Sequence, residues 1–273
     1  MKKYKGLFLL LFLIAILTLI FLKVFVWGFG PQLDKPESIA FDPVGNRFLI
    51  SNVGSGSIIA MDENGKFHKY MHKAFTAPKG LSLRDDMLYV VDPTEVHVVD
   101  VSQASIIDTY KIEGSVALND IAIDEHGMLY ITDMVANAVF IYNPIDRSQA
   151  RVSNPLLQSP NGIIYDRPRW QMLIVNYTDQ SPILSLDIRD QKLSVFMDTV
   201  YSNLDGIAID DLGRIYFSSW SEQLIVEIPQ EQNRFINKFD NLKSAADIYY
   251  HLPTNELIVP QLQKNKIERF SLN

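Results

Sequence analysis

Oxygen-bearing side chains recur at the first position of a short phrase that is repeated along this chain. The phrase consists of a polar residue, a small or polar residue, an apolar run and, usually, an aspartate at its sixth position. Successive copies start 40 to 44 residues apart, at Glu37, Lys79, Asn119, Asn161, Asp205 and Ala246. If these first residues occupy equivalent places, two carboxylates and two amide oxygens converge on one point. Such hard donors suit Ca²⁺ best, with Mg²⁺ or Mn²⁺ as alternatives.

The repeat length indicates which elements place these residues. A period of about 40 residues is typical of a four-stranded propeller blade. In the third unit we expect strands over residues 119–124, 128–132 and 138–143. The chain is therefore predicted to be an all-β, six-bladed β-propeller over residues 29–273. We refer to the five polar first residues as the polar ring: Glu37, Lys79, Asn119, Asn161 and Asp205.

The aspartates that end the phrases favour a structural role. Asp42, Asp124 and Asp210 are each followed by a glycine three residues later, and both residue types are favoured in tight turns. Because hairpin strands alternate in direction, these turns lie at the opposite end of the channel from the polar ring. The loops between second and third strands return to the ring's end. We expect them to form the rim of a pocket, over residues 52–57, 92–95, 133–137, 176–181, 219–222 and 261–265.

The sixth unit lacks a fourth strand, because the chain stops after its third predicted strand, residues 266–272. Propellers commonly close by taking this strand from the other end of the chain. Residues 29–35 are placed to supply it, although Gly30 and Pro31 are poor strand formers.

The first 28 residues differ in character from the rest. Lys2, Lys3 and Lys5 precede an apolar run over residues 6–22, and a second apolar patch follows Lys23. A stretch of about 20 apolar residues is long enough to span a bilayer as a helix. We therefore predict one N-terminal transmembrane helix in residues 1–28, with the propeller outside the cytoplasm. The alternative is a cleaved signal peptide, which would make the protein secreted.

Composition restricts the partners. Four of the 25 basic residues and none of the 32 acidic residues lie in the first 28 positions, which leaves the remainder with a net charge of −11. Nucleic acid is therefore not an expected partner, since its recognition needs a basic face. The chain has no cysteine, which excludes disulfides and thiol chemistry. The five histidines fall away from the polar ring, and we expect none to be catalytic.

The phrases also resemble a known family. Similarity to the senescence-marker-protein/gluconolactonase superfamily, which includes regucalcin and bacterial gluconolactonases, extends over residues 36–273. The matching segments are Pro36-Glu37-Ser38, Leu118-Asn119-Asp120, Pro160-Asn161-Gly162 and Leu204-Asp205-Gly206.

This resemblance implies roles for individual residues. Glu37, Asn161 and Asp205 would hold a divalent cation, Asn119 would be a further ligand or a substrate contact, and Asp120 would lie behind the ligands or contact substrate. Ala117 departs from the family, because sugar-lactone members carry an arginine there. A polyhydroxylated sugar acid is thus a less expected substrate.

Lys79 is the second departure. Its ammonium could pair with Glu37 and compete with the cation, could contact an anionic substrate, or could point to solvent. Two aromatic residues of the predicted rim, Tyr177 and Trp220, could line an apolar substrate pocket, or they could serve blade packing.

These features predict a metal-dependent hydrolase, with Ca²⁺ as the favoured ion, that acts on a small-molecule lactone or related ester in the channel. Asp205 is the favoured general base and Asp120 the second catalytic candidate. The main alternative is a non-catalytic binding propeller, because similar phrases occur in NHL repeats. A third option is a synthase-like relative that kept the fold and lost the metal. The sequence does not indicate an oligomeric state.

A reporter fused after Asn273 tests the predicted topology. Because the basic residues precede the apolar run, we expect a reporter that works only outside the cytoplasm to be active and to sediment with membranes. Activity of a reporter that works only in the cytoplasm would contradict the assignment.

Overall fold

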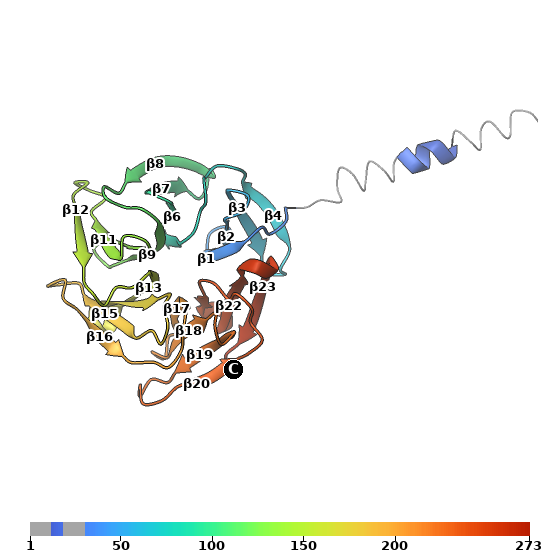
Figure 1. The fold of residues 1–273 in the computed structure, drawn as a ribbon. Coiled ribbons are helices and arrows are strands. Elements are labelled where there is room, and N and C mark those ends of the chain that lie inside the picture. The colour runs from blue at the N-terminus through green and yellow to red at the C-terminus, as the bar shows by residue number, and fades with distance from the viewer. Residues whose placement is uncertain (1–11, 19–30) are drawn as a thin grey trace, which may run out of the picture.

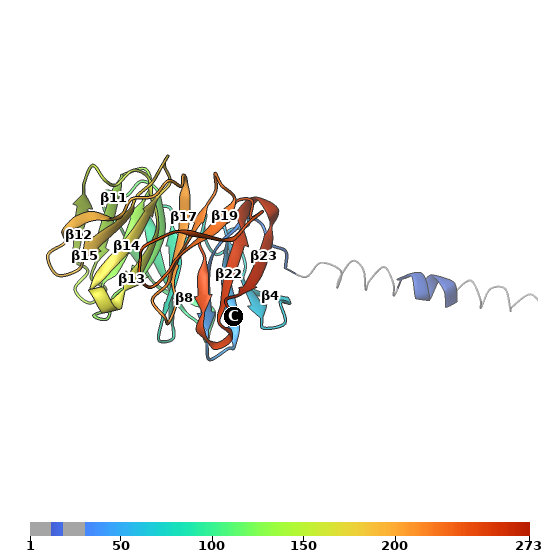
Figure 2. The same ribbon diagram turned by 90° about the horizontal axis from the view of Figure 1, so that it is seen from below.

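The computed structural model of this chain describes residues 12–18, which are helical, and residues 31–273, which form a ring of six sheets. Figure 1 shows the ring along its central channel, and Figure 2 shows it from the side as a disc. Within these two ranges no helix has the length and apolar character needed to cross a membrane. Most of the predicted anchor, residues 1–28, lies outside the described residues, so the anchor stays a prediction.

Each sheet is one blade, and its antiparallel strands follow one another in sequence order. This confirms the predicted six-bladed, all-β architecture. The first three blades are β1 (Pro36–Asp42), β2 (Arg47–Asn52), β3 (Ser57–Asp62) and β4 (Phe67–Met71); β5 (Leu81–Arg84), β6 (Met87–Asp92), β7 (Glu95–Asp100) and β8 (Ser105–Lys111); and β9 (Leu118–Ile123), β10 (Leu129–Asp133), β11 (Ala138–Tyr142) and β12 (Gln149–Ser153).

The other three blades contain short 3-10 turns besides strands. They are β13 (Pro160–Asp166), η1 (Arg167–Arg169), β14 (Gln171–Asn176), β15 (Ile183–Asp187) and β16 (Leu193–Met197); β17 (Leu204–Ile209), β18 (Ile215–Ser219), β19 (Leu224–Ile228) and β20 (Ile236–Phe239); and β21 (Tyr249–His251), η2 (Leu252–Thr254), β22 (Glu256–Gln261), η3 (Leu262–Lys264) and β23 (Lys266–Ser271).

Apolar packing between blades holds the ring together. Over residues 31–273, six buried clusters lie one at each interface between neighbouring blades. Successive residues of a strand point to opposite faces, so a single strand serves two interfaces. On β2, Phe48 and Ile50 pack with Ile258 of blade six, whereas Leu49 packs with Val90 of blade two. Middle strands such as β3, β11 and β19 are mostly apolar because both of their faces are buried.

The turn aspartates have the predicted structural role. The Asp124 carboxylate accepts backbone N–H groups from His126 at 2.8 Å and Met128 at 2.9 Å. Asp210 does the same for the turn after β17, accepting from Arg214 at 2.8 Å. These bonds satisfy the backbone of the hairpin at the end of the channel away from the polar ring.

The junction of blade six with blade one closes the ring without an exchanged strand. Blade six has three strands, as predicted, but residues 31–35 form no strand beside them. The carbonyl groups of Asp34 and Lys35 instead accept hydrogen bonds from Gly54 at 2.9 Å and Val53 at 3.1 Å, in the loop after β2. The expectation of a closing strand is thus wrong for residues 31–35, and Phe29 and Gly30 lie outside the described residues. Lys35 is left-handed, with φ of 55°, which ends any extended conformation before β1.

Direct contacts between the first strands make this closure. The backbone N–H of Asp247 donates to the carbonyl of Glu37 at 3.1 Å, and the Ser38 hydroxyl donates to the Asp247 carboxylate at 2.6 Å. Ile39 and Phe48 pack against Ile258 in the apolar cluster beneath. Blades one and six are thus joined at the channel wall.

Glycine at the second position of the phrase allows neighbouring first strands to come close. A Cβ on Gly162 would lie 2.3 Å from the carbonyl oxygen of Asp205, and a Cβ on Gly206 would lie 2.4 Å from the backbone nitrogen of Ile248. Any side chain there would collide with the backbone of the next blade. The Asn-Gly and Asp-Gly pairs therefore set the spacing of the strands that carry Asn161 and Asp205.

Replacing Gly206 with alanine should lower the free energy of unfolding by about 3 kcal/mol, because the added Cβ meets backbone rather than a movable side chain. Gly65→Ala is the comparison. A Cβ at Gly65 meets open space, and only its φ of 79° opposes the substitution, so a loss of about 1–2 kcal/mol is expected. Urea denaturation of both variants measures the difference, and equal losses would contradict the close-approach argument.

Candidate active site

Irregular strand pairing places the oxygen donors of the polar ring. In each of the four blades that carry a donor, the ladder between the first and second strand shifts register at the start of the phrase. A β-bulge bends the strand and re-aims its side chains. The donors at these shifts are Glu37, Asn119, Asn161 and Asp205. In blade two, β5 begins at Leu81 and pairs regularly with β6, so Lys79 approaches from the segment that precedes the strand.

The structure brings the whole polar ring to one cavity. All five ring side chains line a partly open cavity of about 290 Å³ at one end of the channel. The four oxygen donors are 1 to 6% exposed, whereas Lys79 is partly buried. Tyr177 and Trp220 line the same cavity, so seven of the eight predicted site residues lie together.

The rim of this cavity comes from the loops between second and third strands, as predicted. Five of the six loops each contribute one large apolar or aromatic residue: Val53, Met134, Tyr177, Trp220 and Leu262. The rings of Tyr177 and Trp220 meet edge to face, with centroids 5.7 Å apart. Sequence reasoning missed three of these residues and also Lys35. The signal was present, because each of the five directly follows the last residue of a second strand.

Hydrogen bonds connect Lys79 to both amides of the ring. The Lys79 Nζ donates to Asn119 Oδ1 at 2.5 Å. The Asn119 Nδ2 donates in turn to Asn161 Oδ1. Both amide oxygens that were predicted as ligands therefore accept hydrogen bonds within the ring.

The carboxylates of the ring are less well paired. In the described part of the chain, Glu37 Oε2 and Asp205 Oδ1 are buried and have no hydrogen-bond partner. The indole N–H of Trp220 is also buried without a hydrogen bond of ordinary geometry, but it and the Asn161 side chain lie near enough to the Asp205 carboxylate to lower its pKa. An unpaired buried charge is costly, so these oxygens need a proton, a cation or a donor from a bound molecule.

Burial perturbs both acids. It raises the pKa of Asp205 to about 7, an effect that the charge of Asp247 reinforces and the ammonium of Lys79 opposes. Burial also raises the pKa of Glu37 well above its usual range, again against the influence of Lys79. The two groups therefore favour protonation when no cation accompanies them.

The donor set fits a divalent cation. Glu37 and Asp205 supply two orphaned carboxylate oxygens to the cavity, and Asn119 and Asn161 supply neutral amide oxygens. Oxygen ligands with two negative charges suit Ca²⁺, Mg²⁺ or Mn²⁺.

A second group of potential ligands lies in the rim loop of blade two. Oxygen and nitrogen atoms of Asp92, Glu95 and His97 lie within 4.8 Å of one another. The Asp92 carboxylate already accepts backbone N–H groups from Thr76 at 2.8 Å and Ala77 at 2.6 Å. We assign this group a structural role in anchoring the connection between blades one and two.

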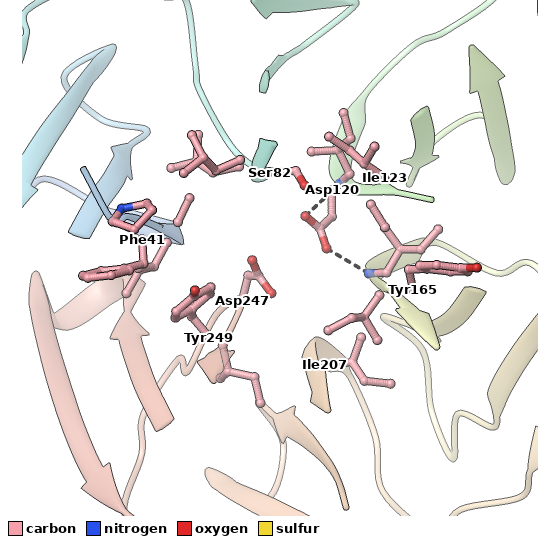
Figure 3. A pocket seen from close by; sticks show the side chains of 18 of the residues that line it. Phe41, Ser82, Asp120, Ile123, Tyr165, Ile207, Asp247 and Tyr249 are labelled. Carbon is pink, nitrogen blue, oxygen red and sulfur yellow. Dashed lines mark hydrogen bonds between the residues drawn. The ribbon is translucent and has the colours of Figure 1, made fainter. Parts of the chain in front are cut away.

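Asp120 faces the other end of the channel. Its carboxylate accepts backbone N–H groups from Ile121 at 2.7 Å and Ile163 at 2.8 Å. It lines a separate cavity of about 540 Å³, together with Asp247 and mostly apolar residues. Figure 3 shows both carboxylates pointing toward the middle of this space. The structure thus separates Asp120 from the cavity that holds the polar ring.

Comparison with known proteins identifies the family of this chain. The sequence pattern of the SMP-30/gluconolactonase/LRE-like family matches residues 35–240. The chain belongs to this family. No curated protein sequence matches this chain.

Several solved structures share the fold. A gluconolactonase from Xanthomonas campestris is 14% identical, with a TM-score of 0.75 over 89% of this chain and 87% of that one. The virginiamycin B lyase of Staphylococcus aureus is 14% identical, with a TM-score of 0.65 over 89% and 86% of the two chains. A chain of the nidogen/laminin complex is 14% identical, with a TM-score of 0.67 over 82% and 93%. At these identities the likeness shows the fold alone.

The pKa of Asp205 predicts how stability depends on pH and cation. With a chelator present, folded Asp205 keeps its proton up to about pH 7, whereas an unfolded aspartate loses it near pH 3.9. The folded state then binds more protons between these values, so this group's contribution to stability falls as the pH rises. Ca²⁺ should offset the loss, by about 2.7 kcal/mol at a hundred times its dissociation constant.

Melting temperatures from pH 4 to pH 8, in chelator and in Ca²⁺, test this dependence. Asp205→Asn is the matched control, because it removes the titrating group and leaves all other carboxylates. The decline with pH in chelator should be steeper in the natural protein than in the variant. Parallel curves, or a melting temperature that Ca²⁺ leaves unchanged, would contradict the prediction.

Proposed function

We propose that this chain is a metal-dependent hydrolase of a lactone or related ester, with the polar ring as its active site and Ca²⁺ as the favoured ion. The observation that carries the proposal is the pair of orphaned, buried carboxylate oxygens of Glu37 and Asp205 in one cavity with two amides. Membership of the SMP-30/gluconolactonase/LRE-like family supports it.

Each residue of the polar ring has a role in the proposed hydrolysis that follows from its charge and position. Glu37, Asn161, Asp205 and Asn119 would hold the ion, which when bound would polarise the substrate carbonyl. Asp205 would take the proton of the attacking water, because its carboxylate lies in the cavity beside the other residues that would hold the ion. Asn119 and Lys79 would orient the substrate from the adjoining blades.

The shape of the cavity supports an apolar substituent on the substrate. Five rim loops each place an apolar or aromatic residue around the polar floor, and Tyr177 and Trp220 form one wall. Ala117, where sugar-lactone members carry an arginine, removes a donor for hydroxyl groups. We therefore propose lactones or esters with an alkyl or aryl group rather than sugar lactones.

A non-catalytic binding propeller is the second candidate, favoured by the structural likeness to a chain of the nidogen/laminin complex. A lyase reaction fits less well. A histidine-to-alanine substitution makes the virginiamycin B lyase catalytically inactive, whereas no histidine is among the described residues that line the polar-ring cavity. A metal-free, synthase-like role would leave the orphaned carboxylates unexplained.

For location, we propose that the N-terminal segment anchors the chain in a membrane and that the propeller lies outside the cytoplasm. The basic residues before the apolar run support this orientation.

The Asp205→Asn variant tests whether Asp205 acts as a general base or only as a ligand of the ion. The substitution keeps the size and one oxygen but removes the charge, so kcat should fall about 10²–10⁴-fold even at saturating Ca²⁺. The assay uses short-chain and long-chain lactones and aryl esters, with Ca²⁺ or with chelator. Glu37→Gln is the control, for which activity should largely return as Ca²⁺ is raised.

Full recovery of both variants at high Ca²⁺ would refute Asp205 as the base. No hydrolysis by the natural protein in either condition, with no bound metal by elemental analysis, would leave the binding propeller as the better account.

A further inference from the structure

Lys79 is a cation placed among the side chains that would bind one. It is the first residue of the phrase in blade two. The same position carries an oxygen-bearing side chain in blades one, three, four and five. Its ammonium donates to Asn119 Oδ1 at 2.5 Å. We propose that Lys79 is a built-in competitor of the divalent cation, whose ammonium must leave Asn119 before the cation binds. This inference rests on the metal-dependent function proposed above.

The hydrogen-bond chain gives the first reason. Lys79 engages the oxygen of Asn119, and the Asn119 amide nitrogen engages the oxygen of Asn161. Both amides are thereby oriented with their oxygens occupied. A cation that uses these oxygens meets the ammonium at Asn119 and the Asn119 amide nitrogen at Asn161, so its binding competes with two hydrogen bonds that the cation-free ring possesses.

Charge gives the second reason. Glu37 and Asp205 place two carboxylates in the cavity, and Lys79 supplies the opposite charge beside them. When a divalent cation sits on the carboxylates, the ammonium becomes a neighbouring like charge. Interactions between charges are strong where water is excluded, so Lys79 lowers cation affinity.

The backbone around Lys79 is held in place by hydrogen bonds, so only the side chain can move away from the cation. The Lys79 N–H donates to the carbonyl of Val91 at 2.9 Å, and the Gly80 N–H donates to the carbonyl of Asn119 at 2.9 Å. The main chain is therefore fixed on both sides of Cα. The long, partly exposed lysine stem can still swing its charge toward the mouth of the cavity, where it would face a substrate once the cation is bound.

Calcium titration by isothermal calorimetry of the full-length chain tests the proposal. Lys79→Met should bind Ca²⁺ about tenfold more tightly or better than the natural protein, because it removes both the like charge and the donor to Asn119. Lys111→Met controls for net charge, since Lys111 is exposed on β8 of the same blade. Its affinity should match that of the natural protein.

Lys79→Gln is a second variant, which keeps an N–H donor for Asn119 without the charge. It should also bind Ca²⁺ more tightly than the natural protein, and it serves if Lys79→Met fails to fold. In chelator, both Lys79 variants should melt at a lower temperature than the natural protein, since the carboxylates lose their counter-charge, and Ca²⁺ should reverse the order.

Unchanged or weaker binding in both Lys79 variants would overturn the proposal, as would equal tightening in Lys111→Met or no Ca²⁺ binding by any variant. Hydrolysis is measured separately. If the Lys79 variants bind Ca²⁺ more tightly but no variant hydrolyses a substrate, Lys79 competes with the cation and the hydrolase proposal fails. If the protein hydrolyses a substrate but the Lys79 variants bind Ca²⁺ with unchanged affinity, the hydrolase proposal stands and the competition proposal fails.

Discussion

The site depends on how the charge of two buried carboxylates in one cavity is compensated. Glu37 and Asp205 each keep one oxygen without a hydrogen bond in the described part of the chain, and burial raises the pKa of both. Such groups are costly unless a proton or a positive charge accompanies them. The ring around them supplies one ammonium and two amides, and oxygen donors of these types suit a divalent cation.

The first and second positions of the repeated phrase have different roles. The first position faces the ring cavity, while the second joins adjacent blades. Ser38 accepts the backbone N–H of Leu81 at 3.1 Å and donates to Asp247 at 2.6 Å. Asp120 accepts the N–H of Ile163 at 2.8 Å. A one-residue step along the strand thus separates a side chain that lines the ring cavity from one that bonds to the neighbouring blade.

Much of the architecture could be predicted because it is local and repeated. The blade count, the turn aspartates and the rim loops follow from period, turn chemistry and strand alternation, and the structure confirms them. The closing strand could not be predicted from placement alone, since Leu33 packs into the junction of blades one and six while Asp34 and Lys35 bond to a neighbouring loop.

The repeat alone indicates which residues share the ring, because an equivalent place in each repeat becomes an equivalent place around the axis. How these side chains meet depends on the packing of the blades. This packing paired Lys79 with Asn119, left oxygens of Glu37 and Asp205 unpaired, and turned Asp120 toward the other cavity. These outcomes depend on β-bulges, on the approach of adjacent blades at glycine and on loss of water. Such effects arise between segments about 40 residues apart and leave no local signature.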